Sequence, residues 1–186
     1  MISEKIQSQI TSENTSDCNL IIGRKGTGKS TYISKIIDNT EKPEIIFISP
    51  KIAKYRIINE SKKVLLMNQF SLISSDLLNE EINNSLLLFD DCKQYINSNP
   101  NEHLTKKFID FLIESRHKNN SIYFVFHSFS QVNERFFSLI DRIILFKTMD
   151  NITKFKNLFS DYETIEKNFN EINKSKNDHD SIIIDL

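Results

Sequence analysis

The sequence contains very little glycine, no tryptophan and only two cysteines. All three glycines of the 186 residues lie within one eight-residue stretch. With 14 phenylalanines and no tryptophan, we expect phenylalanine and isoleucine to fill the core. The two cysteines, Cys18 and Cys92, do not have the spacing of a metal site and suit a reducing compartment.

Further absences exclude other classes of protein. No apolar run approaches the roughly 20 residues that cross a bilayer as a helix. Residues 1–17 are polar and lack the pattern of a signal or transit peptide. The net charge is −1, so any binding to nucleic acid must use local basic patches. The hydrophobic content of 39% argues against disorder, and the length predicts one domain with a small appendage.

The stretch that holds the glycines is the strongest motif in the chain. It reads GRKGTGKS over residues 23–30 and matches G-x-x-x-x-G-K-[ST], the phosphate-binding P-loop. Glycine lets backbone N–H groups turn inward and approach an anion with no Cβ in the way. An apolar run precedes the loop and isoleucines at helical spacing follow it, so we expect a helix N-terminus to point at the phosphates.

The motif assigns roles to its residues. We expect Lys29 to reach the β- and γ-phosphates of ATP and the hydroxyl of Ser30 to bind Mg²⁺. The residues expected to bind the nucleotide are Gly23, Arg24, Lys25, Gly26, Thr27, Gly28, Lys29, Ser30 and Thr31.

Strands and helices alternate along the chain. Strands are expected at 19–22, 44–49, 63–67, 85–91, 121–127 and 142–146, and helices at 28–38, 69–82, 102–117 and 131–139. Continuous apolar strands separated by helices predict an α/β fold with a mostly parallel central sheet covered by helices on both faces. We expect a polar segment at 1–17, a P-loop domain at 18–160, and a C-terminal helix or linker with an apolar tail at 161–186. Within that last part, the polar stretch 168–180 is interpreted as a mobile linker, and 181–186 as an edge strand or a contact for a partner.

A pair of carboxylates, Asp90 and Asp91, follows the apolar residues at 86–89. At the C-terminal end of a parallel strand these acids would face the ligand crevice. Asp90 is the candidate carboxylate in the second coordination shell of Mg²⁺, and Asp91 is the candidate for orienting and polarising the attacking water. Hydrolysing P-loop ATPases more often carry Glu at the second position, so the shorter Asp allows slower hydrolysis or an intervening water.

Two basic side chains complete the candidate site. Arg116 ends the helix expected at 102–117, where it suits either a charge-neutralising finger or an interaction with the helix dipole. His127 ends an otherwise apolar strand, where a polar sensor of the γ-phosphate would lie. We therefore predict Lys29, Asp91, Arg116 and His127 as the catalytic residues.

The order of these motifs resembles the FtsK–HerA superfamily of ring ATPases, and within it the viral genome-packaging ATPases, over residues 18–148. Lys29 and Ser30 match the P-loop pair, and Asp90 and Asp91 match the acidic pair. The arginine of the family's Arg-His turn corresponds to Arg116, and His127 stands where the family usually has Gln.

The resemblance implies a P-loop NTPase fold of the RecA/ASCE-like type that uses ATP and Mg²⁺. It also implies a homo-oligomeric ring, usually a hexamer, with nucleotide at the subunit interfaces and double-stranded DNA in the pore. Capsid vertex or portal proteins are the implied partners, and the host cytoplasm or the packaging vertex of the virion is the implied location.

Basic residues between the second and third strands suit contacts with DNA phosphates, or a solvated face. They are Lys51, Lys54, Arg56, Lys62 and Lys63, with Tyr55 among them. Three other functions remain open: an export ATPase similar to the Zot proteins, a small P-loop nucleotide kinase, and a nucleotide-gated binding module with little turnover.

Overall fold

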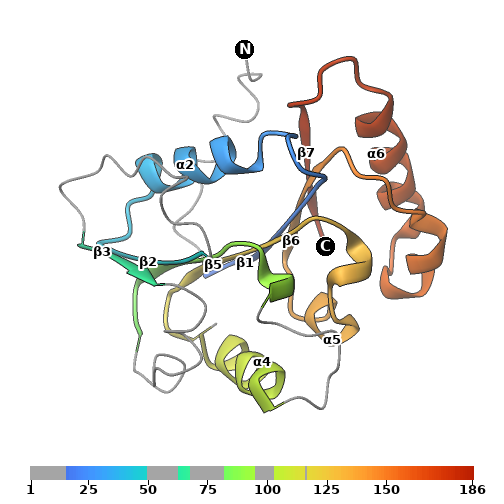
Figure 1. Cartoon of the computed structure of the whole chain (residues 1–186). Helices are drawn as coiled ribbons and strands as arrows, with labels where there is room; N and C mark the ends of the chain where they lie inside the picture. Colours follow the sequence, from blue (N-terminus) through green and yellow to red (C-terminus); the bar gives the residue numbers. More distant parts are fainter. Residues whose placement is uncertain (1–15, 50–62, 68–81, 95–102, 116) are drawn as a thin grey trace.

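A computed structural model describes residues 16–49, 63–67, 82–94, 103–115 and 117–186. Its centre is a seven-stranded sheet with the strand order β3-β2-β4-β5-β1-β6-β7 (Figure 1). The strands are β1 (Cys18–Ile22), β2 (Glu44–Ile48), β3 (Lys63–Met67), β4 (Ser85–Phe89), β5 (Ser121–Phe126), β6 (Arg142–Phe146) and β7 (Ser181–Asp185). Only the pairing of β7 with β6 is antiparallel among the described strands. The mostly parallel α/β sheet that the sequence predicts is thereby confirmed.

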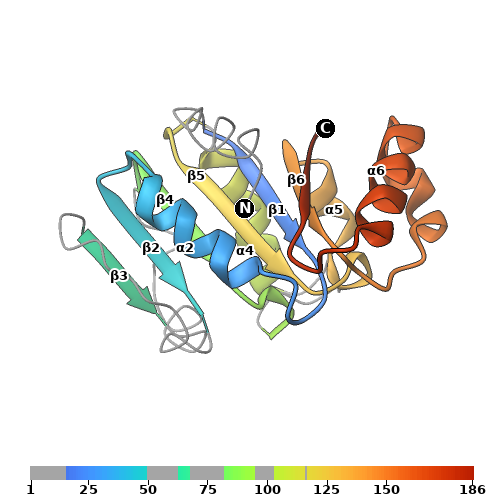
Figure 2. The same cartoon turned by 90° about the horizontal axis from the view of Figure 1, so that it is seen from above.

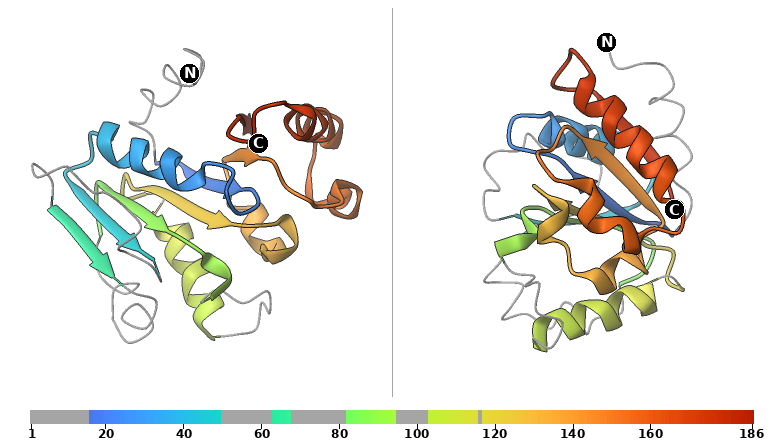
Figure 3. Two further views of the ribbon diagram at one scale, coloured as in Figure 1. Left: turned by 45° about the horizontal axis from the view of Figure 1, so that its top comes forward. Right: turned by 90° about the vertical axis from the view of Figure 1, so that its right-hand side faces the viewer.

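Helices cover both faces of the sheet, as Figures 1 and 2 show. The α-helices are α2 (Lys29–Asn39), α4 (His103–Ser115), α5 (Glu134–Phe137) and α6 (Tyr162–Lys174), and the 3₁₀ helices are η3 (Cys92–Gln94), η4 (Phe129–Gln131) and η5 (Ile152–Leu158). Helix α2 lies on one face, and α4 lies on the other (Figure 3). No helix in the described part of the chain carries an apolar stretch long enough to cross a membrane.

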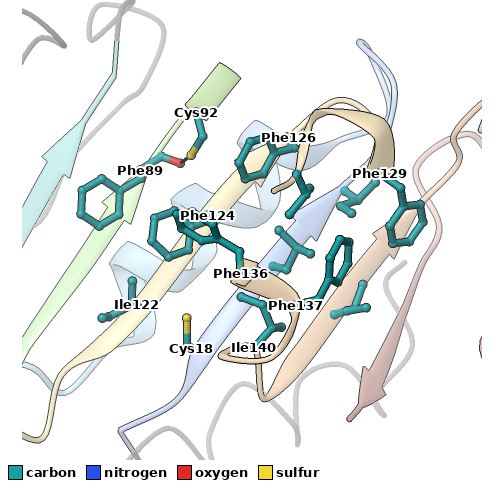
Figure 4. Close-up of a cluster of buried hydrophobic side chains, with 14 of the residues drawn as sticks. Cys18, Phe89, Cys92, Ile122, Phe124, Phe126, Phe129, Phe136, Phe137 and Ile140 are labelled. Atoms are coloured by element: carbon teal, nitrogen blue, oxygen red, sulfur yellow. Dashed lines mark hydrogen bonds between the residues drawn. The ribbon is translucent and has the colours of Figure 1, made fainter. Parts of the chain in front are cut away.

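Phenylalanine and isoleucine fill the core, as their abundance predicts. On the face of α2, Ile33, Ile36 and Ile37 pack on inward-facing residues of the central strands. Figure 4 shows the opposite face, where rings from β5, η4 and α5 pack together. There Phe124 stacks on Phe89 with ring centroids 4.9 Å apart, and Phe136 meets Phe124 edge to face. Burial on both faces explains why the central strands read as continuous apolar runs.

The helix predicted at 131–139 is wrong in extent. The structure divides this region into η4 and the four-residue α5. Two polar side chains cause the division, because each begins a separate helix. The side chain of Ser128 accepts from the N–H of Ser130, and that of Asn133 accepts from the N–H of Arg135. The helix predicted at 69–82 lies outside the described residues, apart from Ile82.

The linker predicted at 168–180 is wrong for residues 168–174, because α6 continues to Lys174. Asp161 caps this helix by accepting from the N–H of Thr164, and Ile165, Phe169 and Ile172 bury one stripe of it. The apolar tail forms β7, so of the two alternatives for 181–186 the edge strand is confirmed.

Candidate nucleotide-binding site

The P-loop connects β1 to α2, at the edge of the sheet where the parallel strands end. Gly26 and Gly28 have φ angles of 86° and 94°, which L side chains rarely adopt. Gly28 precedes α2 without a side-chain cap, so the first-turn N–H groups of the helix point into the loop. This backbone has the form that the motif predicts for an anion site.

Gly23 serves a different purpose, which is close packing. A Cβ at this position would lie 2.5 Å from the Cβ of Phe146 and 2.9 Å from the hydroxyl oxygen of Thr27. The neighbouring N–H of Arg24 donates to the carbonyl of Lys147 at 2.8 Å. The start of the loop is therefore held directly against the end of β6.

Lys29 lies at the centre of the loop with its side chain buried. Its ammonium donates to the carbonyl oxygens of Gly23 and Arg24, the latter at 2.8 Å. The third neighbour is Nδ1 of His127, at 3.1 Å from the Lys29 nitrogen. The ammonium is thus positioned by three acceptors from two adjacent strand ends.

The contact with Lys29 determines which nitrogen of His127 carries hydrogen. A lysine ammonium can only donate, so Nδ1 accepts in this contact, and the tautomer that allows it carries its hydrogen on Nε2. Nε2 lies 3.8 Å from Oδ1 of Asp91, the second acid after β4. The backbone N–H of His127 donates to the side-chain oxygen of Gln131 at 3.0 Å, which fixes the strand tip. His127 therefore lies between the P-loop lysine and the acid that we expect to act on water.

The two acids differ in their surroundings. Asp90 is buried, and its carboxylate accepts from the hydroxyl of Ser49 at 3.1 Å. Its backbone N–H donates to the carbonyl of Ile48 at 2.8 Å, so the residue extends the β4 ladder. Asp91 has a φ of 52°, a left-handed conformation that Asp tolerates better than most residues. After this turn Asp91 is half-buried, whereas Asp90 is buried.

The structure places the other predicted residues less centrally. Arg24 lies at the surface and pairs with Asp178, while Lys25 and Thr31 are exposed. Ser30 is half-buried in the first turn of α2. Arg116 lies outside the described residues, so its role stays a prediction. The predicted DNA contacts at 51–62 also lie outside them, and Lys63 is described only as the start of β3.

Sequence reasoning missed Asp178 and Lys147. The ammonium of Lys147 lies 2.9 Å from a carboxylate oxygen of Asp178, and the guanidinium of Arg24 lies 3.2 Å from the same oxygen. The hydrogen bond and charge of Lys147, followed by the charge of Arg24, lower the pKa of Asp178 below its usual value. The partners are 31 and 154 positions away in the chain, so no local pattern could reveal the pair.

The donor set of the site fits Mg²⁺. Among the described residues, no group of three or more His, Cys, Asp or Glu side chains is arranged to hold a metal ion by itself. Mg²⁺ typically takes one or two protein oxygens and completes its shell with phosphate oxygens and water. A single buried carboxylate from Asp90 and the Ser30 hydroxyl suit that mode of binding.

Comparisons with known proteins support the fold. No family model and no curated protein matches the chain. The DNA-packaging ATPase B204 from Sulfolobus Turreted Icosahedral Virus superposes with a TM-score of 0.68 at 17% identity, over 93% of this chain and 94% of that one. The genome packaging NTPase B204 from Sulfolobus turreted icosahedral virus 2, in complex with AMPPCP, gives 0.66 at 16% identity, over 92% and 93%.

A third similar structure contains EssC ATPases 2 and 3 from Geobacillus thermodenitrificans. Its TM-score is 0.54 at 10% identity, over 91% of this chain and 38% of that one. At these identities the likeness concerns the arrangement of the elements. The chain thus has the RecA/ASCE-like P-loop NTPase fold, in the form found in the viral packaging NTPase B204.

Proposed function

We propose that this chain is an ATPase that moves double-stranded DNA into a viral capsid. The observation that carries the ATPase part is the contact of His127 with both Lys29 and Asp91. Lys29 begins α2, which the P-loop connects to β1, while His127 and Asp91 follow β5 and β4. These three strands are neighbours in the sheet. A P-loop lysine, a polar strand tip and an acid therefore meet where the phosphates of a nucleotide would lie.

Each residue has a defined task in this proposal. Lys29 exchanges its carbonyl partners for phosphate oxygens and neutralises their charge. Asp91 accepts a hydrogen bond from the attacking water, and Nε2 of His127 lies 3.8 Å from its carboxylate oxygen. Ser30 and Asp90 would hold Mg²⁺, whose charge stabilises the charge that develops on the phosphates.

The DNA-packaging part rests on the likeness to B204, which extends over more than nine-tenths of both chains. The proposal includes a homo-oligomeric ring, in which Arg116 acts on the nucleotide of the neighbouring subunit. It also includes double-stranded DNA in the pore and a capsid vertex or portal protein as the docking partner. The basic residues at 51–63 are the proposed contacts with DNA phosphates.

A second candidate is a nucleotide-gated binding module with little turnover. The observation that favours it is Asp91 at a position where hydrolysing P-loop ATPases more often carry Glu, because the shorter carboxylate reaches less far toward the attacking water.

Phosphate release from ATP and Mg²⁺, measured with and without linear double-stranded DNA, distinguishes these functions. The packaging proposal predicts turnover that DNA stimulates and that Asp91→Asn abolishes while ATP binding remains. ATP binding without turnover in the wild type would instead support the binding module. Phosphoryl transfer to an added nucleoside monophosphate would support a kinase and contradict the packaging proposal.

A further inference from the structure

A cavity of about 900 Å³ lies beside the P-loop. The first turn of α2 lines one side of it with Gly28, Thr31 and Tyr32. The other side is the C-terminal segment from Glu171 to Ile182, which Figure 1 shows beside the P-loop end of α2. Its volume falls in the range of about 300–1,000 Å³ that is usual for small-molecule sites. The cavity therefore adjoins the predicted phosphate site on the side of the C-terminal segment.

The lining of this cavity is apolar on part of its surface and polar on the rest. Tyr32 and Phe146 meet edge to face, with ring centroids 5.8 Å apart, and provide apolar surface in the lining. Asn177 and His179 bring polar groups from the C-terminal segment. The combination suits a flat, largely apolar ring joined to a hydroxylated sugar, which is the chemistry of a nucleoside.

The wall formed by residues 175–180 touches the P-loop directly. Nδ1 of His179 lies 3.3 Å from the point that a Cβ on Gly28 would occupy. Within the segment, Asp180 accepts from the hydroxyl of Ser175 and from the side-chain amide of Asn177, so the turn holds its own shape. The position of the turn relative to the P-loop therefore depends on contacts outside the turn.

Asp178 makes two of those outside contacts. Its carboxylate pairs with Arg24 of the P-loop and with Lys147 at the end of β6. The ammonium of Lys147 also donates to the carbonyl of Ser175, so the same lysine contacts the turn at Ser175 and at Asp178. Because Lys147 is buried and charged, its two hydrogen bonds hold the turn in one position relative to β6.

We propose that Asp178 is a positioning residue, which holds residues 175–180 against the P-loop as the wall of a pocket for the nucleoside half of a nucleoside triphosphate. This inference rests on the proposed nucleotide function. The P-loop and the residues proposed to hold Mg²⁺ bind the phosphates, whereas the base and ribose need the wall. Loss of Asp178 should therefore weaken binding of the nucleoside half of the ligand without weakening binding of its phosphates.

Calorimetric titration of the full chain with ATP and with inorganic tripolyphosphate, both with Mg²⁺, tests the inference. Asp178→Ala is expected to weaken ATP binding about tenfold, because charged hydrogen bonds that position the wall are lost. Tripolyphosphate binding is expected to stay equal or to become tighter, because a negative charge near the phosphate site is removed. Asp178→Glu, which keeps the charge, is expected to restore most of the ATP affinity. The matched control Glu163→Gln removes an exposed acid of α6 outside the cavity and should change neither ligand.

An equal loss of affinity for ATP and for tripolyphosphate in Asp178→Ala would overturn the inference, because Asp178 would then maintain the P-loop itself. An equal gain of affinity for both ligands would overturn it as well, since only the charge of Asp178 would then matter. His179→Ala gives a second test that leaves both ion pairs in place, and it should weaken ATP severalfold with tripolyphosphate unchanged. An unchanged ATP affinity in His179→Ala would contradict the pocket. If Lys29→Ala has no effect on either ligand, the proposed nucleotide function fails, and the inference fails with it.

Discussion

Substitution of Gly23 by alanine tests how closely the P-loop approaches β6. The added Cβ would lie 2.5 Å from the Cβ of Phe146, an atom that moves only with the β6 backbone. Strand β6 is paired with β1 on one side and β7 on the other, so neither chain can retreat easily. Overpacking of this kind costs about 1–3 kcal/mol, which corresponds to a loss of about 2–12 °C in Tm for a chain of this size.

Gly26→Ala is the comparison that separates close packing from backbone strain. An added Cβ at Gly26 meets no atom within 4 Å, but its φ of 86° makes the change strained. That strain costs about 1–2 kcal/mol and is confined to the loop. Urea unfolding followed by circular dichroism measures both variants, and the Phe146 contact predicts the larger loss for Gly23→Ala. Wild-type stability of Gly23→Ala would refute the close approach.

Three further predictions concern the catalytic groups, and each is measured by ATP binding and phosphate release. Asp91→Asn should keep nucleotide binding and lose hydrolysis, whereas Asp90→Asn should weaken the Mg²⁺-dependent function. Equal loss of nucleotide binding in both variants would mean that Asp91 is a metal ligand or a structural acid. His127→Gln should retain most turnover because its amide can accept from Lys29 and donate to Asp91, whereas His127→Leu should not; equal rates for the two would refute the bridging role. Arg116→Ala should lower the rate of ATP hydrolysis by a factor of about 10³–10⁵ while ATP binding remains. Mixing this variant with Lys29→Ala should restore activity once subunit exchange is shown. Exchange without restored activity would exclude action in trans.

The sequence predicts the central sheet well because its strands are buried on both faces. The strands at 63–67 and 142–146 have the predicted bounds, and the others differ by one or two residues at an end. Hydrophobic runs are local signals, so they can be read without knowing which strands pair. The P-loop is local in the same way, and two of its three glycines, Gly26 and Gly28, have the positive φ angles that favour glycine.

Features that depend on contacts between residues far apart in the sequence were not predicted. The stretch 168–180 looks like a linker because α6 buries only Phe169 and Ile172 within it, and the rest is polar. The role of Asp178 depends on Arg24 and Lys147, which only the folded sheet brings to it. The contact of His127 with Lys29 has the same origin, because β1 and β5 are neighbours in the sheet but lie 98 positions apart at these residues.

The most direct test of the nucleotide site is a comparison of ATP binding and hydrolysis in the wild type and in Lys29→Ala. Lys29 lies at the centre of the P-loop, and its ammonium contacts loop carbonyls and His127 rather than the hydrophobic core. Lys35→Ala, on the same helix, is the matched control and should behave as the wild type. The site described here predicts that Lys29→Ala remains folded but loses productive ATP binding or turnover. Hydrolysis by Lys29→Ala at the wild-type rate would contradict it.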